Sequence, residues 1–237
     1  MEPLAGRVAL VTGAGRGIGR ALAEHAAQEG MLVVLTDGDL AALEETERLL
    51  KGEGATVLAV GLDLARPTAA ERLVQEALDE YGALHLLAVA PPLPAEPTGW
   101  ESPPSAWQAA LEASVVSTAS LLRATLSPWQ QQGEGQLLLV LSAPALLPTC
   151  PQPLAHVTQH ALLALAEQVS ASLATAEANI GVSVLLSQLE NETTTPSATL
   201  AEEATAALAA LRQRQRLVTT RPELLAQLRQ HAVRRWG

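Results

Sequence analysis

The stretch TGAGRGIG, residues 12–19, follows a short apolar run and precedes a segment with helical spacing. In that setting Gly13 permits a tight turn, Gly17 lets the backbone approach a pyrophosphate, and Gly19 allows the helix to pack closely on the strand. The helix N-terminus then offers free N–H groups and the positive end of its dipole to a phosphate. The stretch therefore predicts a phosphate-binding turn between a strand and a helix.

Apolar runs of strand length and segments of helical period alternate on both sides of this turn. Such alternation is typical of a parallel sheet covered by helices on both faces. The sequence therefore predicts an α/β fold, a three-layer, Rossmann-type, doubly wound parallel sheet, and the absence of repeats favours a single domain over residues 1–237. We expect strands over residues 7–13, 31–37, 55–63, 84–90, 135–142 and 180–187, and helices over residues 16–30, 39–54, 67–82, 105–132, 154–178 and 200–215, followed by a short strand and an amphipathic helix at about 221–237.

Composition bounds the class of protein. With 237 residues, 48% of them hydrophobic and 17% charged, the chain is ordinary for a soluble globular domain. No stretch reaches the roughly 20 apolar residues of a membrane span, and the N-terminus lacks signal-peptide features, so we expect a cytoplasmic protein. The formal charge of −10 argues against nucleic acid as a partner, although the tail from Arg212 onward is basic. A single cysteine, Cys150, excludes an internal disulfide framework.

An acidic residue, Asp37, ends the second apolar run and is placed to accept hydrogen bonds from the hydroxyls of an adenosine ribose. A 2′-phosphate there would face a carboxylate, so NAD(H) is favoured over NADP(H). Arg16 in the turn weighs against this choice, because a guanidinium could reach such a phosphate. The alternative for Asp37 is a turn or N-cap role, but Asp39 fits the N-cap of the next helix better.

The pattern TGxxxGxG, together with Asp37 and LDL at residues 62–64, resembles the short-chain dehydrogenase/reductase family, and the order of elements is similar over essentially the whole chain. The resemblance implies hydride transfer between a nicotinamide and an alcohol or ketone, and contact between Asp63 and adenine. It also implies a homo-oligomer, dimer or tetramer, in which the helix over residues 105–132 packs at an interface. The cofactor-binding positions that it implies are Gly13, Gly15, Arg16, Gly17, Ile18, Gly19, Asp37, Asp63 and Leu64.

The catalytic set of that family is Asn, Ser, Tyr and Lys, and this sequence departs from it. Ser142 matches the Ser position, whereas the Tyr-x-x-x-Lys stretch falls on His156 and His160, and Ser114 matches the Asn position. Composition supports this alignment, because the one Tyr and the one Lys of the chain lie elsewhere, at positions 81 and 51. The nicotinamide and catalytic half of the resemblance is therefore degenerate, and its adenosine half is intact.

Other family landmarks have changed as well. The Asn-Asn-Ala-Gly that ends the fourth strand aligns with residues 89–92, VAPP, and the Pro-Gly after the sixth strand aligns with Ser187 and Gln188. The usual C-terminal strand is replaced by the variant helix at about 221–237. The loop over residues 188–199 occupies the position of the family's substrate lid, and its composition does not identify a substrate.

Three interpretations of the His pair are open. An imidazole titrates near pH 6.5, against about 10 for Tyr, so His156 could exchange a proton without help from a lysine. A metal site needs a third ligand; Glu167 lies roughly 10 Å further along the helix, and Cys150 is the other nearby candidate, so we expect no metal. The interpretation that we favour is polar lining of a vestigial cleft, with a core stripe formed by Leu154, Val157, Ala161, Leu162 and Leu165.

The C-terminal helix carries an apolar stripe of Leu225, Leu228, Ala232 and Trp236 among Arg side chains. Such a helix docks on a membrane surface or a partner, or packs on its own domain, with basic residues complementing the dipole at its C-terminus. We favour packing on its own domain.

The sequence thus predicts an NAD(H)-binding member of the family that is weakly active or non-catalytic, a sensor or a partner subunit that pairs with an active relative. The alternative is an NAD-dependent oxidoreductase for an unidentified alcohol or ketone, with Ser142 and His156 in the proton-transfer site.

Overall fold

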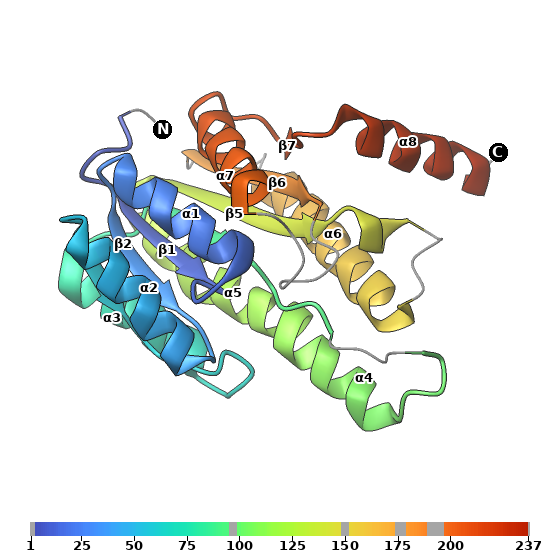
Figure 1. Ribbon diagram of the computed structural model, residues 1–237, viewed down its shortest axis with the longest axis horizontal. Coiled ribbons are helices and arrows are strands. Elements are labelled where there is room, and N and C mark those ends of the chain that lie inside the picture. Colours follow the sequence, from blue (N-terminus) through green and yellow to red (C-terminus); the bar gives the residue numbers. More distant parts are fainter. Residues whose placement is uncertain (1–2, 95–98, 148–151, 174–178, 189–196, 237) are drawn as a thin grey trace.

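One parallel sheet organises the molecule (Figure 1). The computed structural model describes residues 3–94, 99–147, 152–173, 179–188 and 197–236. Within them, seven strands pair in the order β3-β2-β1-β4-β5-β6-β7, so the chain reverses its direction across the sheet between β1 and β4. The strands are β1 (Val8–Thr12), β2 (Leu32–Thr36), β3 (Val57–Ala59), β4 (Leu86–Val89), β5 (Glu134–Ser142), β6 (Asn179–Ser187) and β7 (Leu217–Val218).

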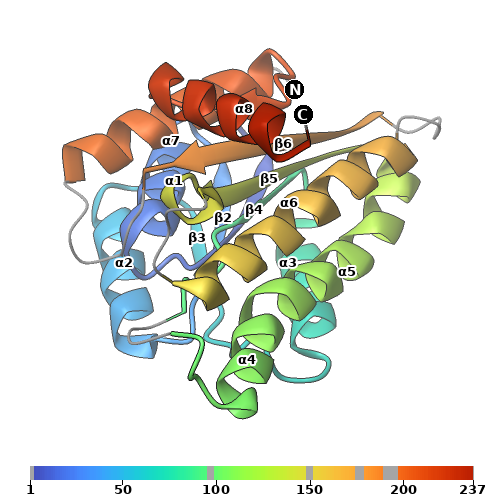
Figure 2. The same ribbon diagram turned by 90° about the vertical axis from the view of Figure 1, so that its right-hand side faces the viewer.

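Helices cover both faces of the sheet, which gives three layers (Figure 2). Buried residues of α1, α2 and α7 pack together on one face, and those of α3, α5 and α6 pack on the other. The predicted doubly wound α/β fold is confirmed. The helices are α1 (Gly17–Gln28), α2 (Leu40–Gly52), α3 (Ala69–Tyr81), α4 (Pro104–Leu111), α5 (Ser117–Gln132), α6 (Pro153–Leu173), α7 (Ser197–Arg212) and α8 (Pro222–Trp236).

The strands are apolar on both sides because both of their faces are buried. In β1, Ala9 and Val11 belong to the cluster beneath α1, and Val8 and Leu10 belong to the cluster on the opposite face. Leu, Val and Ala supply most of this core, since the chain contains no Phe. No helix in the described part of the chain has the length and apolar character needed to cross a membrane.

The strand order reverses at the junction of β1 and β4, and a contact joins the two strand ends there. The backbone N–H of Ala90 donates a 3.1 Å hydrogen bond to Oγ1 of Thr12, the last residue of β1. Ligands of open α/β sheets bind in the crevice outside the strand ends at such a switch point. The fold therefore places the glycine turn, which begins at Thr12, at the edge of that crevice.

The helix predicted over residues 105–132 is interrupted by one wider turn. A π-helical segment, Glu112–Val116, separates α4 from α5. Hydroxyl groups bond to the carbonyls there: Ser114 donates to Ala110 O at 2.6 Å, and Thr118 donates to Ser114 O at 2.6 Å. Such segments occur often at functional sites, and this one contacts α6.

The predicted core stripe of the His-bearing helix is wrong in one position. Val157 is 39% exposed, whereas Thr158 and Gln159 are buried beside Leu154 and Leu162. The helix is apolar on most sides, so its spacing alone does not determine which side faces the sheet. The predicted end of this helix, residues 174–178, lies outside the described residues.

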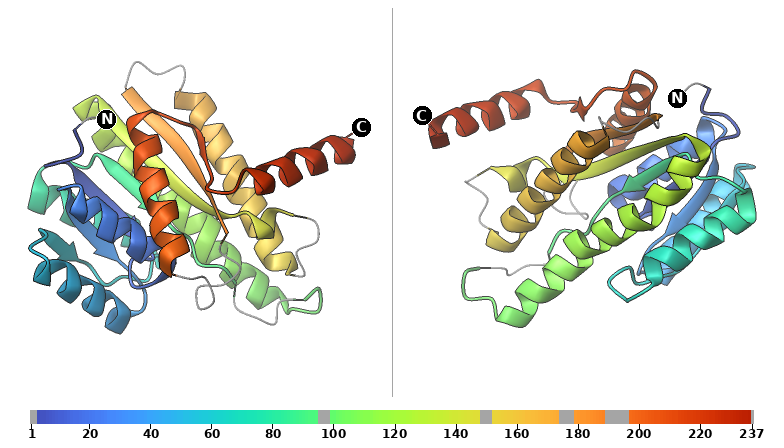
Figure 3. Two further views of the ribbon diagram at one scale, coloured as in Figure 1. Left: turned by 45° about the horizontal axis from the view of Figure 1, so that its top comes forward. Right: turned by 180° about the vertical axis from the view of Figure 1, so that it is seen from behind.

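The C-terminal helix α8 extends away from the body of the molecule (Figures 1 and 3). Its first turns carry Leu224, Leu225 and Leu228, which are partly buried against the cluster of α3, α5 and α6. The side chains of Ala232 and Trp236, the other half of the predicted stripe, lie outside the described part of the chain.

Candidate functional site

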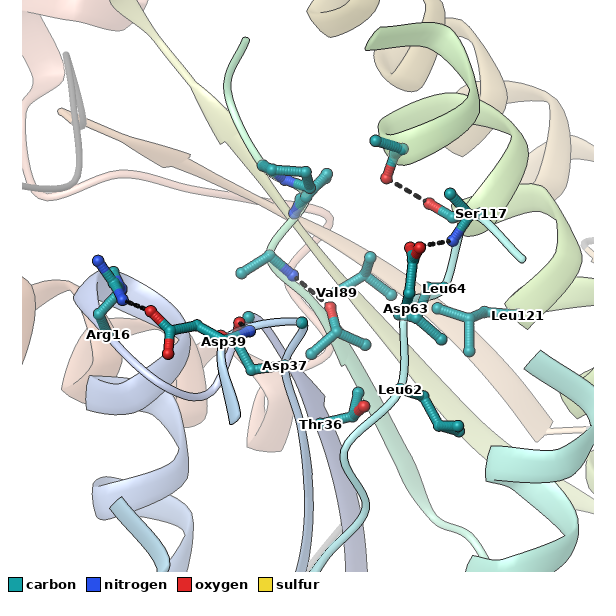
Figure 4. Close-up of a pocket in the computed structure, with 18 residues that line it drawn as sticks. Arg16, Thr36, Asp37, Asp39, Leu62, Asp63, Leu64, Val89, Ser117 and Leu121 are labelled. Carbon is teal, nitrogen blue, oxygen red and sulfur yellow. Dashed lines mark hydrogen bonds and ion pairs between the residues drawn. The ribbon is translucent and has the colours of Figure 1, made fainter. Parts of the chain in front are cut away.

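A cleft of about 350 Å³ opens at the carboxyl ends of β1, β2 and β4 (Figure 4). The glycine turn and the acidic residues after β2 form one wall, and the loop after β3 with α5 forms the other. The apolar part of the lining consists of Leu62, Leu64, Val89 and Leu121. The cleft thus combines an apolar slot with polar groups along its rim, as small-molecule sites usually do.

The glycines of the turn stand at positions where a side chain would be strained or would clash. Gly13 and Gly17 have φ angles of +62° and +57°, in the left-handed region that side chains disfavour. A Cβ on Gly13 would also lie 2.7 Å from the carbonyl oxygen of Ala90, and a Cβ on Gly19 would clash with that of Gly13. No side chain caps the N-terminus of α1, and its first turn holds no acidic residue, so the positive end of its dipole is not offset within the helix.

Hydrogen bonds and an ion pair fix the acidic rim. One carboxylate oxygen of Asp37 accepts from the N–H of Gly15 and the other from the N–H of Asp39, both at 2.9 Å. The Asp39 carboxylate caps α2 by accepting from Ala42 N at 3.1 Å and also pairs with the guanidinium of Arg16. Asp37 therefore keeps one further lone pair on each oxygen at the cleft, and Arg16 is drawn toward Asp39 (Figure 4).

Across the cleft, the loop after β3 presents Asp63. Its carboxylate accepts from Ala65 N at 3.0 Å and lies 3.6 Å from the guanidinium of Arg66. Ser117 of α5 lies on the same side and donates to Ala113 O at 2.7 Å (Figure 4). At the wall of the cleft, the hydroxyl of Thr36 is buried with no hydrogen-bond partner among the described residues.

A second cavity, of only about 20 Å³, lies on the other side of the glycine turn. It is bounded by Gly13 and Gly19, by the loop after β4, and by Ser142 and Gln159. By the same measure it is much smaller than the large cleft. The two cavities share Gly13, Arg16, Ala90 and Pro91 as lining residues, which makes them neighbours.

Gln159 holds the end of β5 in place. Its side-chain Oε1 accepts a 2.8 Å hydrogen bond from the backbone N–H of Ser142, and it is 1% exposed. The Ser142 hydroxyl is nearly buried too, and it accepts from Ala145 N at 3.4 Å.

The two imidazoles are held by backbone carbonyls. Nδ1 of His156 lies 2.8 Å from Ala145 O, and Nδ1 of His160 lies 2.9 Å from His156 O. Because a carbonyl oxygen only accepts, each Nδ1 carries the proton of the neutral ring. The ring centroids are 4.3 Å apart, so the two side chains lie side by side on α6.

The structure gathers most of the predicted cofactor residues and separates them from the His pair. Gly13, Arg16, Asp37, Asp63 and Leu64 line the large cleft, and Gly13, Arg16, Ile18, Gly19 and Ser142 line the small cavity. Among the described residues, those predicted as site residues that line neither space are Gly15, Gly17, Ser114, His156 and His160.

Sequence reasoning did not single out Gln159, Pro91 or Leu93, which form walls of the small cavity. A signal for Gln159 exists in retrospect: it is a long amide between the two imidazoles on a helix that is otherwise largely apolar.

Within the described residues, no three His, Cys, Asp or Glu side chains come together as a metal site. Cys150 and most of the predicted lid, residues 189–196, lie outside the described residues.

A buried carboxyl group lies at the end of β6, beside the predicted lid. Glu203 of α7 is fully buried; it accepts from the hydroxyl of Ser187 at 2.6 Å and from Gln188 N at 2.8 Å. Burial raises the pKa of Glu203 above its ordinary value, and the two hydrogen bonds oppose part of that rise. These contacts connect the end of β6 to α7. Ser187 and Gln188 stand at the positions where the family that the sequence resembles has Pro-Gly.

Comparison with known proteins places this geometry in a family. The family model described as short chain dehydrogenase matches residues 7–198. Dehydrogenase/reductase SDR family member 4 of Bos taurus is 31% identical over 185 residues, which cover 78% of this chain and 66% of that protein. The matches cover slightly less than two thirds of the length of such curated relatives.

Solved structures share the fold over most of the chain. A short-chain dehydrogenase/reductase from Burkholderia phymatum in complex with NAD is 27% identical, with a TM-score of 0.88 over 97% of this chain and 94% of that one. L-Sorbose reductase from Gluconobacter frateurii, complexed with NADPH and L-sorbose, is 28% identical, with a TM-score of 0.71 over 77% of this chain and 69% of that one. Similar structures therefore hold either form of the cofactor.

Proposed function

Because this chain belongs to the short-chain dehydrogenase/reductase family, a family of oxidoreductases, we propose that it binds NAD(H) and is a weakly active or non-catalytic member. The proposal rests on a difference between the adenosine side of the crevice and the positions of the family's catalytic residues. The adenosine side is an open cleft with a carboxylate and a glycine turn at its rim, whereas the positions of the family's Tyr and Lys hold two imidazoles that line neither cavity.

The residues of the large cleft fit the adenosine half of a dinucleotide. Asp37 offers acceptor lone pairs to ribose hydroxyls, and the uncapped N-terminus of α1 offers N–H groups to a pyrophosphate. Leu62, Leu64 and Leu121 supply apolar contact for an adenine ring. When bound, the nicotinamide of such a cofactor supplies hydride chemistry.

The charges of the rim favour NAD(H) over NADP(H). A 2′-phosphate beside the ribose would meet the carboxylates of Asp37 and Asp39 together, and Arg16, the cation of the turn, is already paired with Asp39. The NAD complex of the Burkholderia relative is consistent with this preference. The L-sorbose reductase complex with NADPH shows that the opposite preference also exists among similar folds.

The positions of the one Tyr and the one Lys of the chain support weak or absent catalysis. The one Tyr of the chain, Tyr81, ends α3, and the one Lys, Lys51, lies in the last turn of α2 and pairs with Glu47. Neither residue lines the large cleft or the small cavity. Such a member acts as a nucleotide sensor or as a partner subunit, within a homo-oligomer or paired with an active relative through the long α4–α5 helix.

One observation favours the alternative, an NAD-dependent alcohol or ketone oxidoreductase. The bond from His156 Nδ1 to Ala145 O leaves the lone pair of the neutral ring on Nε2, where it can accept a proton. In that enzyme Ser142 polarises the substrate oxygen and His156 exchanges its proton.

Two measurements test the proposal together. Calorimetric titration is expected to give NADH binding that is at least about tenfold tighter than NADPH binding. NAD-linked turnover over a panel of alcohols and ketones is expected to be at the level of a His156→Ala variant. Turnover that His156→Ala abolishes, with NADH affinity retained, would establish the enzyme instead, and failure to bind any dinucleotide would reject both.

A further inference from the structure

We propose that the site takes ligands of the adenosine-diphosphate class, with ADP-ribose as the complete fitting unit, and that Gln159 keeps the nicotinamide ring of a dinucleotide out of the site. The inference rests on the proposed function, because both use the same adenosine cleft. It adds that NAD and NADH are held by their ADP-ribose part alone.

The path of a dinucleotide across the strand ends decides where its second half must go. With the ribose at Asp37 and the pyrophosphate at the N-terminus of α1, the remaining half continues past Gly13 and Gly19 toward the end of β5. The small cavity lies on that path, since its lining includes both glycines and Ser142. It measures about 20 Å³, against about 350 Å³ on the adenosine side. By the same measure, the space on the nicotinamide side is therefore far narrower than the space on the adenosine side.

Gln159 closes this cavity from the side of α6, and it is held firmly. Its side chain is 1% exposed, and its Oε1 accepts from Ser142 N at 2.8 Å. Rotating the side chain away would remove this acceptor from the buried N–H of Ser142. It would also break the hydrogen bond of the Gln159 amide oxygen, and both changes are unfavourable. The residue therefore acts as a fixed wall.

The opposite wall belongs to the loop after β4. Pro91 and Leu93 line it, and Leu93 packs against the apolar cluster that includes Ile18 and Val140. Pro91 and the following Pro92 restrict the backbone of the loop, because each ring fixes φ. A nicotinamide that entered would have to displace packed side chains on two elements.

Ligand-observed NMR tests the proposal on the wild-type chain. In saturation-transfer difference spectra with NADH, the adenine protons are expected to receive strong saturation and the nicotinamide protons almost none. In calorimetry, ADP-ribose, NAD and NADH are expected to bind within about threefold of one another. Nicotinamide saturation equal to that of adenine, or NAD binding that is more than about tenfold tighter than ADP-ribose binding, would overturn it.

Two variants open the cavity from opposite walls. Gln159→Ser and Leu93→Ala are each expected to raise the affinity for NAD relative to ADP-ribose by about fivefold or more and to bring nicotinamide saturation into the spectra. Leu93→Ala leaves the Gln159 bond intact, so it covers the case in which Gln159→Ser does not fold. The control is Gln168→Ala, an exposed amide on the same helix, which should leave the ratio unchanged.

The outcomes separate the two proposals. If adenine and nicotinamide protons are saturated equally in the wild type, NAD binding stands and this inference fails. If none of ADP-ribose, NAD or NADH binds, the proposed function fails, and this inference fails with it.

Discussion

Oε1 of Gln159 accepts the backbone N–H of Ser142 at 2.8 Å, and this bond joins the helix that carries both imidazoles to the end of β5. The buried side chain of Gln159 also lines the small cavity beyond the glycine turn. The side chain therefore has both a structural role and a consequence for binding.

Removing this amide should destabilise the protein. Gln159→Ala leaves a buried N–H without this acceptor, which costs about 1–3 kcal/mol of the free energy of unfolding. Urea denaturation followed by circular dichroism measures it. Gln168→Ala, at an exposed position on the same helix, should stay within about 0.5 kcal/mol of wild type. Equal stabilities for the two variants would show that the bond contributes nothing.

A methyl group on Gly19 should disrupt the turn. Gly19→Ala places a Cβ against the carbonyl oxygen of Gly13, so the backbone must shift, at a cost of about 1–3 kcal/mol in the free energy of unfolding. NADH affinity should fall with it. Gly52→Ala is the control, because no atom lies near its Cβ and its φ is not positive; it is expected to be neutral or stabilising by up to about 1 kcal/mol. Thermal unfolding of both variants checks the contrast, and a Gly19→Ala protein as stable as Gly52→Ala would contradict it.

The carboxylate of Asp37 should control the choice of cofactor. Asp37→Asn weakens the acceptors offered to the ribose and removes a negative charge from the rim, so NADH affinity is expected to drop about tenfold while NADPH affinity holds or improves. Isothermal calorimetry with both cofactors measures the change. Asp79→Asn, at an exposed position of α3, controls for the loss of one charge. A parallel loss of both cofactors in Asp37→Asn would indicate a structural effect in place of selectivity.

Glu203 should give the stability a distinct dependence on pH. Because its pKa is raised in the folded state, its contribution to stability is complete below the ordinary pKa of 4.5 and is lost as the pH rises through the folded value. Glu203→Gln lacks this loss, so its stability should increase relative to wild type as the pH rises from about 4.5 toward neutrality.

The pH test is denaturation of both proteins across that range, with Glu202→Gln, the exposed neighbour, as the control for charge. A constant difference between Glu203→Gln and wild type would show that the carboxyl group titrates alike in the folded and unfolded chains.

Much of this architecture is predictable from local pattern. The glycine turn, the alternation of apolar runs with helical segments, and the N-cap at Asp39 are all short-range features, and the structure agrees with them. The π-helical turn was not predicted, although Ser117 and Thr118 supply hydroxyls that donate to one of its carbonyls, Ser114 O.

The rotation of α6 could not be predicted in the same way. Its apolar residues surround most of the helix, so sequence spacing gives several equally good core faces, and the one chosen leaves Val157 39% exposed. The buried face is the one from which Gln159 bonds to β5, a contact across 17 positions of sequence. The closure of the small cavity depends on the same contact, together with Pro91 and Leu93 from another loop, so no single stretch of sequence contains it.

The central claim is that the cleft beside the glycine turn holds the adenosine half of a dinucleotide. A titration of nitrogen-15-labelled protein with NADH, followed through the backbone amide resonances, tests it most directly. We expect saturable shifts at Gly13, Ile18, Asp37 and Leu64, which line the proposed adenosine and phosphate positions. Shifts confined to other surfaces, or none at millimolar NADH, would contradict it.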